Sequence, residues 1–215
     1  MGVLWPWAVV AGLGAYHGID PSMGWLFAVA LGLQDQRRSR VLWSLVPITA
    51  GHLISIGFVV AIFTTLQSLV AIAWLQPAGA FALISFGTFR LFSRRGHPRW
   101  VAMRVNWIQL ALWSFLMASA HGAGLMLFPI LLGIVPPGGV CGDSIGRRGA
   151  LMMHAHIQAI AVVLLHVGAM AVVMGAIAIL VYEKIGLAIL RSAWINLDAI
   201  WAAALIGAGV ISLVV

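Results

Sequence analysis

Two pairs of histidines repeat along the chain with the same internal spacing. His17 is followed by His52 after 35 residues, and His121 is followed by His156 after the same interval. Both pairs lie in long apolar segments, and the first histidine of each pair precedes a glycine. Imidazole binds nickel, cobalt, zinc and copper ions, and two imidazoles can also ligate a haem iron. Because an ionisable side chain is costly in an apolar segment, the four histidines predict one shared ligand site in a duplicated unit.

The residues after His17 add an oxygen and a sulphur to the candidate ligands. Asp20 and Met23 lie three and six residues further on, and Asp20-Pro21 is typical of a helix start. Asp caps free N–H groups there, and proline loses no hydrogen bond at the first helical position. Gly18 is expected to adopt the left-handed conformation that ends the preceding helix. The pattern predicts a helix broken at mid-depth; the alternative is a kinked helix in which His17 and Asp20 bond locally.

Membrane helices are needed to position these side chains. The chain is 63% hydrophobic and 8% charged, with a mean hydropathy of +1.08, which excludes a water-soluble domain. We expect an all-α polytopic membrane protein, because apolar stretches of this length read as transmembrane helices. A second break is expected near His121, where Pro129 also removes a helical hydrogen bond. The six expected spans are 4–33, 41–66, 69–91, 105–135, 150–181 and 195–215. The first is expected to be broken at 17–21 and the fourth at 121–124.

The basic residues predict how these spans are oriented. Ten of the 12 lie in the segments after the first, third and fifth spans, which are expected to be cytoplasmic. Both termini are then non-cytoplasmic, and we expect a bacterial inner-membrane protein. The same placement at span ends argues against a nucleic-acid partner. We expect a single membrane domain, 1–215, made of two halves, 1–99 and 100–215. Because each half has three spans, the second half enters the membrane from the opposite side, so the two halves are expected to form a 3+3 inverted repeat.

Other polar residues leave alternatives open. His166 lies ten residues beyond His156 and at nearly the same helical angle, so it is either a second site, a relay or a lone satisfied histidine. His154 points to a different face from His156. Asp198 either caps the sixth span or reaches the core. Cys141 and Asp143 are too few to predict a metal site in their loop.

The two motifs of the first half resemble those of the nickel/cobalt transporter group of the lysine-exporter superfamily. That group carries His-[Ala/Gly]-x-x-Pro-Gly-His in the first span and small-His-x-x-[Ser/Gly] in the second. This chain has His-Gly-Ile-Asp-Pro-Ser-Met at 17–23 and Gly-His-Leu-Ile-Ser at 51–55, so Ser22 and Met23 replace the glycine and second histidine. The resemblance covers about a quarter of the chain. It implies six spans in a 3+3 arrangement and transport of a nickel- or cobalt-like ion.

Three functions fit these features, and none of them is an enzyme activity. The first is a secondary transporter, coupled to protons, for a divalent or soft transition-metal ion of the Ni, Co, Zn and Cu class. The second is a membrane electron carrier in which histidines ligate haem. The third is a non-catalytic membrane subunit, or a transporter of another small solute. The lipid bilayer and the metal ion are the expected partners, with a homo-oligomer or a partner subunit as a further possibility.

Overall fold

The computed structural model describes residues 4–69, 72–92, 105–134, 145–185 and 197–214. Within these ranges the chain is helical and contains no strand. The all-α class expected from the sequence is therefore confirmed for the described residues.

The first expected span is broken where the sequence places it. Helix α1, Trp5–Ile19, is followed by a 3₁₀ turn, η1, Pro21–Met23, and by α2, Trp25–Asp35. Asp20 caps the turn by accepting a hydrogen bond from the Ser22 N–H at 2.8 Å. Gly18 stays helical, so its expected left-handed conformation is wrong. The left-handed residue is Gly24, at φ 117°, because the inserted 3₁₀ turn moves the change of direction to its own end.

The segments expected as the second and third spans form helices α3, Arg38–Leu69, and α4, Ile72–Phe92. The expected link at 67–68 is wrong, because these residues continue α3. Both are helix formers with no glycine or proline to stop the helix before Leu69. The connection therefore falls no earlier than 70–71, which lie outside the described residues.

The segment expected as the fourth span is broken into α5, Trp107–His121, α6, Ala123–Met126, and α7, Phe128–Ile134. Asn106 starts α5 with a capping box. Its side-chain oxygen accepts a hydrogen bond from the backbone N–H of Gln109, and the side-chain oxygen of Gln109 accepts one from the backbone N–H of Asn106. Gly122 ends α5 in the left-handed conformation, at φ 68°. The break expected at 121–124 is thus confirmed.

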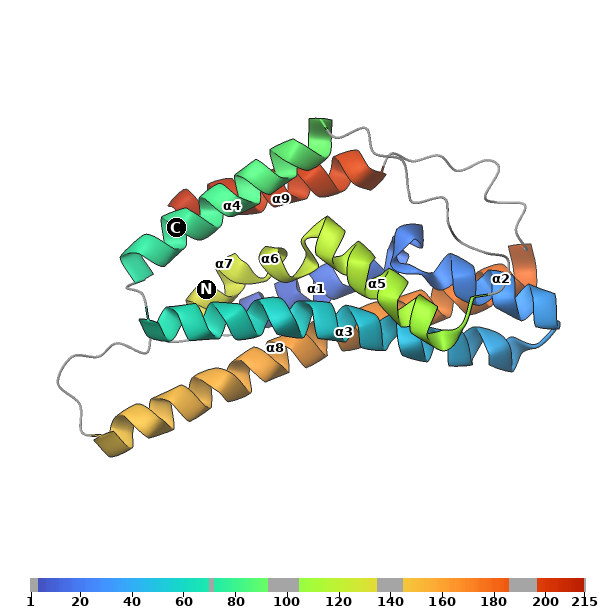
Figure 1. The fold of residues 1–215 in the computed structure, drawn as a ribbon, viewed down its shortest axis with the longest axis horizontal. Helices are drawn as coiled ribbons and strands as arrows, with labels where there is room; N and C mark the ends of the chain where they lie inside the picture. Colours follow the sequence, from blue (N-terminus) through green and yellow to red (C-terminus); the bar gives the residue numbers. More distant parts are fainter. Residues whose placement is uncertain (1–3, 70–71, 93–104, 135–144, 186–196, 215) are drawn as a thin grey trace.

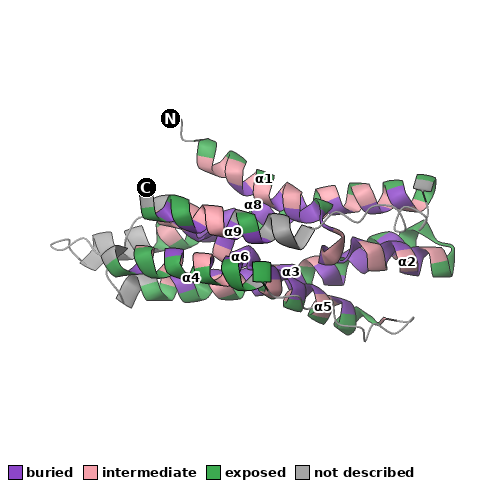
Figure 2. Ribbon diagram, turned by 90° about the horizontal axis from the view of Figure 1, so that it is seen from above, coloured by how far each residue is buried: buried purple, intermediate pink, exposed green. Residues whose placement is uncertain are grey.

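The last two helices are α8, Ile145–Leu180, which continues into a π-helical turn, η2, Val181–Ile185, and α9, Leu197–Val214. Three pairs of helices make the most extensive contacts: α1 with α8, α3 with α5, and α4 with α9. Figure 1 shows α4 and α9 side by side in one layer, with α3 and α8 crossing in another. Figure 2 shows the buried turns gathered in the middle of the bundle.

Helices α4 and α9 contact each other through two segments that share a sequence pattern and run in opposite directions. A Cβ atom added at Gly87 would meet the Ala202 carbonyl oxygen at 3.0 Å. One added at Gly209 would meet the Ala80 carbonyl oxygen at 2.9 Å. These residues belong to the segments 80–87 and 202–209, which share the pattern Ala-x-Ala-Leu-Ile-x-x-Gly. The two helices therefore run antiparallel with local twofold symmetry about their contact.

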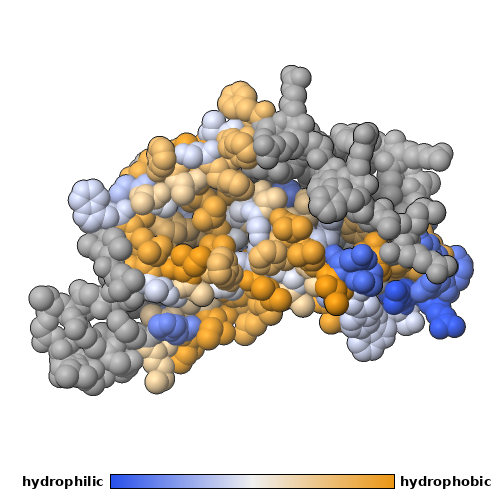
Figure 3. Space-filling model, viewed as in Figure 1, coloured by the Kyte–Doolittle hydropathy of each residue, from blue (hydrophilic) through white to orange (hydrophobic). Residues whose placement is uncertain are grey.

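Two stretches, Arg38–Leu66 of α3 and Met153–Lys184 of α8 and η2, are long and apolar enough to cross a membrane. Only 44% and 33% of their most apolar windows are buried inside the protein. The outward faces carry stripes of exposed apolar residues at helical spacing. These are Ile54, Phe58 and Ile62 on α3, and Ile157, Ile160 and Leu164 on α8. Figure 3 shows hydrophobic residues over the middle of the visible face and hydrophilic ones where α2 meets α3.

Candidate metal centre

Three histidines from three helices meet in the core. His17 comes from α1, His52 from α3 and His166 from α8, and each side chain is fully buried, with 0% exposed. One nitrogen of each ring lies within 4.8 Å of the corresponding atoms of the other two. The rings of His17 and His166 meet edge to face, with centroids 4.8 Å apart. Those of His52 and His166 are nearly parallel at 5.9 Å.

Backbone carbonyl groups orient the histidines at both helix breaks. His17 Nδ1 donates to the Leu13 carbonyl oxygen at 2.8 Å, and His121 Nδ1 donates to that of Met117 at the same distance. A carbonyl oxygen can only accept, so Nδ1 carries the proton in both rings and Nε2 keeps its lone pair. Metal-binding histidines commonly have this arrangement, in which the other ring nitrogen is held by a carbonyl group.

The ring of His52 receives no hydrogen bond from the described residues. Both of its nitrogens are buried, and neither has a partner among the described residues. The ring nitrogens of His166 are also buried, and the ring lies near the Val10 carbonyl group without reaching hydrogen-bond geometry. A buried polar group without a partner costs on the order of 1–3 kcal/mol, so such groups in a native protein call for an explanation. A ligand between the rings would provide one.

Close helix packing brings these rings together. The glycines Gly14 and Gly18 of α1 lie directly against the backbone of α8, at His166 and Met170. The missing side chains allow α1 and α8 to approach, and His17 therefore reaches His166. On the other side, Gly51 of α3 lies against Ala111 of α5.

The break in the first helix is held by contacts from two other helices. The Trp25 indole of α2 donates to the Ile19 carbonyl oxygen at 3.2 Å, which satisfies a group left free at the end of α1. Trp113 of α5 donates to the Ser22 carbonyl oxygen at 3.4 Å. The Ser55 and Ser119 hydroxyl groups, 2.9 Å apart, join α3 to α5 one turn beyond His52. Helix α5 thus contacts both η1 and α3 beside the histidines.

The remaining candidate ligands lie around this group rather than in it. His121 is buried as well, but it lies outside the group of three. Asp20 is buried, and its carboxylate caps η1. Met23 is fully buried in the same turn. The side chain of Asp198, which the sequence left open as a cap or a core residue, lies outside the described part of the chain, as do those of Cys141 and Asp143.

His156 is not brought to the group. Its side chain is exposed, and it lines a pocket of about 290 Å³ against α3 that also includes Leu53 and Thr64. His154 is exposed as well. His166 occupies the position that the repeat spacing assigned to His156, because it lies deeper in α8. The position of each histidine along the fifth expected span could have identified His166 as the buried one. His166 lies near the middle of that segment, whereas His154 and His156 lie at its start.

The donor set suits a transition-metal ion. Metal–nitrogen bonds of about 2.0–2.1 Å put two imidazole nitrogens of a tetrahedral site about 3.4 Å apart. The three nitrogens here all lie within 4.8 Å of one another. Three imidazoles leave a coordination position open for water or another side chain, which is typical of sites that exchange a ligand. No protein-family model, curated protein or solved structure matches this chain.

Proposed function

We propose that this chain is a membrane transporter for a divalent or soft transition-metal ion, which binds between His17, His52 and His166. The proposal depends chiefly on one observation: three fully buried rings face each other, and His52 has no hydrogen-bond partner among the described residues. Neutral imidazoles are ligands for the Ni, Co, Zn and Cu class. Hydrophobic packing alone gives no reason to gather three of them in an apolar core.

The exposed apolar stripes on α3 and α8 support insertion in a bilayer. A core helix of a water-soluble protein is mostly buried, whereas more than half of each apolar window here faces outward. Large exposed apolar surfaces of this kind need lipid or a partner to cover them. We place α3 and α8 across the inner membrane as two of the six proposed spans.

The arrangement of helix pairs supports the 3+3 inverted repeat. Under that repeat the first span corresponds to the fourth, the second to the fifth and the third to the sixth. The α1–α8 and α3–α5 contacts are then equivalent, and both pairs run parallel. The α4–α9 contact is its own equivalent and runs antiparallel. An inverted repeat requires these relative directions.

The site lies between the proposed halves, which favours transport over permanent storage of a metal. His17 and His52 belong to the first half and His166 to the second. Rocking of one half against the other would separate the ligands and open the site to one side at a time. The complete burial of all three rings corresponds to an occluded state of this cycle.

The haem alternative has less support. Ligation by two of these histidines requires the macrocycle to lie between their rings. His17 and His166 touch edge to face at 4.8 Å, which leaves no room for it there. An absorption spectrum of the purified protein distinguishes the two, because bis-histidine haem gives a strong Soret band.

Metal binding by the full-length protein in detergent tests the proposal. We expect wild type to bind about one Co²⁺ or Ni²⁺ ion, measured by elemental analysis after equilibrium dialysis, and His52→Ala to lose that binding. His154→Ala is the matched control, because it removes an exposed histidine from α8 and leaves the group of three intact. Equal binding by wild type and His52→Ala would contradict the site. Ion uptake into proteoliposomes by wild type but not by His52→Ala tests the transport step separately.

A further inference from the structure

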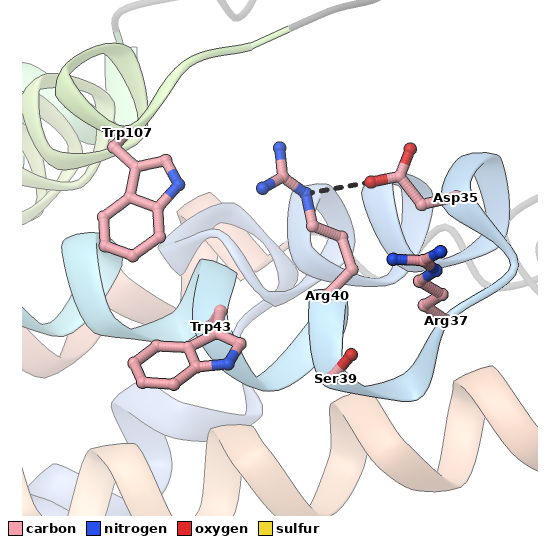
Figure 4. Close-up of a pocket in the computed structure, with 6 residues that line it drawn as sticks. All are labelled: Asp35, Arg37, Ser39, Arg40, Trp43 and Trp107. Carbon is pink, nitrogen blue, oxygen red and sulfur yellow. Dashed lines mark ion pairs between the residues drawn. The ribbon is translucent and has the colours of Figure 1, made fainter.

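A second pocket lies at the end of the bundle where α2 meets α3. It has a volume of about 420 Å³, within the usual range for small-ligand sites. Three helices and the turn between two of them contribute to it (Figure 4). Its lining residues are Asp35, Arg37, Ser39, Arg40, Trp43 and Trp107. The pocket lies away from the histidines, and metal transport assigns it no role.

The charges at this turn do not cancel. Arg38 pairs with Glu183 at 3.0 Å, and Arg40 pairs with Asp35 at 3.2 Å. No carboxylate among the described residues pairs with Arg37. The Arg40 pair uses Nε, so its two terminal nitrogens point away from Asp35 (Figure 4). The pocket thus has a net positive charge and offers arginine donors of the kind that bind phosphate oxygens.

Two tryptophans form the opposite wall. The rings of Trp43 and Trp107 stack with centroids 6.4 Å apart and an interplanar angle of 25°. They are 60% and 47% exposed, at the polar ends of α3 and α5, where tryptophans mark the membrane interface. Within the next turn or two of the same helices, Val46 and Leu112 expose apolar side chains. Charged side chains thus line one side of the pocket and tryptophans the other, and exposed apolar side chains follow the tryptophans along the same helices.

We propose that this pocket binds the phosphate headgroup of an anionic phospholipid. Arg37 and Arg40 bind the phosphate, Trp43 and Trp107 pack beside the glycerol region, and the acyl chains lie along Val46 and Leu112. An amphipathic ligand fits better than a free phosphate ion, because exposed apolar side chains follow the two tryptophans on α3 and α5. The proposal rests on the membrane insertion proposed above but not on the metal cargo. The two can therefore fail separately.

Lipid retention by the full-length protein tests this site. The protein is exchanged into detergent with equal amounts of phosphatidylglycerol and phosphatidylcholine, and native mass spectrometry counts the lipids that stay bound. We expect wild type to retain phosphatidylglycerol preferentially, and Arg37→Gln to weaken that retention about fivefold. Arg38→Gln is the control, because it removes the same charge from the same turn but does not line the pocket. Both arginines are exposed, so neither change is expected to prevent folding.

Three results would overturn the proposal. The first is equal retention of the two lipids by wild type. The second is an equal loss in Arg37→Gln and Arg38→Gln, which would indicate nonspecific attraction of anions. The third is calorimetric binding of inorganic phosphate, lost in Arg37→Gln, without any preference between lipids, because this would assign the pocket to a soluble anion. Metal binding measured on the same variants is expected to be unchanged, and it separates this proposal from the metal site.

Discussion

His17 and His121 make the same hydrogen bond in the last turns of two different helices. Each ring donates from Nδ1 to the carbonyl group four residues earlier, at 2.8 Å. Each is followed by a glycine, Gly18 or Gly122, close to a helix break. The two halves of the chain therefore present an Nε2 atom in the same way. Only His17 has two further rings close enough to share an ion.

The two histidines of α8 test whether geometry or repeat spacing identifies the ligand. We expect His166→Ala to lose bound Co²⁺, because its ring faces His17 and His52. His156→Ala should keep it, because that side chain is exposed on another part of α8. The visible absorption of bound Co²⁺ reports both binding and coordination geometry. Loss of the signal in His156→Ala alone would show that the repeat spacing was the better guide.

Asp20 can be tested as a cap and as a ligand in the same pair of variants. Asn also caps well, so Asp20→Asn should keep the Ser22 hydrogen bond, whereas Asp20→Ala should lower the free energy of unfolding by about 1 kcal/mol. Both variants should still bind metal, because the carboxylate lies outside the group of three. Thermal unfolding and equilibrium dialysis give the two measurements. A stable Asp20→Asn protein that no longer binds metal would make the carboxylate a ligand.

Close packing of α1 against α8 should be sensitive to a single methyl group. A Cβ atom at Gly18 would lie 2.6 Å from the Met170 carbonyl oxygen, so Gly18→Ala forces the helices apart. We expect a loss of about 1–3 kcal/mol in unfolding free energy and weaker metal binding, because His166 moves away from His17. Gly12→Ala on the same helix meets nothing within 4 Å and should be neutral or slightly stabilising. Equal effects of the two changes would argue against this packing.

The symmetric contact between α4 and α9 predicts a matched pair of variants. Gly87→Ala and Gly209→Ala place a methyl group against equivalent atoms, 2.8 Å from Ile206 Cγ1 and 2.7 Å from Ile84 Cγ1. Each should destabilise the protein by a similar amount, about 1–3 kcal/mol. Gly207→Ala faces open space and serves as the control. Clearly unequal melting temperatures of the first two variants would contradict a twofold relation between these helices.

Local chemistry made the helix breaks predictable. Asp20 and Pro21 act as a cap and a first residue, as their types require, and Gly122 ends α5 with a positive φ. These preferences depend on neighbours within a few residues, so the sequence states them directly. The position of the left-handed glycine in the first break was wrong. Gly24 takes that conformation instead of Gly18, because a 3₁₀ turn separates the two half-helices.

A second internal similarity lies at a different offset from that of the histidine pairs. The histidine pairs are offset by 104 residues, whereas the shared segments at 80–87 and 202–209 are offset by 122. Additional residues between His156 and Ala202 shift the second copy. Aligning the sequence with itself at a single offset therefore cannot match both the histidine pairs and the shared segments. The contacts of Gly87 and Gly209 show that the second pair of segments is equivalent in space.

The sequence by itself determined the helical class and both helix breaks, because apolar length and capping are properties of short segments. Only the tertiary structure decided which histidines meet. His166 and His156 share a helix and nearly the same face, and local preferences do not distinguish them. The choice depends on how α1 and α8 cross, and Gly14 and Gly18 determine that crossing by letting the two backbones touch at His166 and Met170.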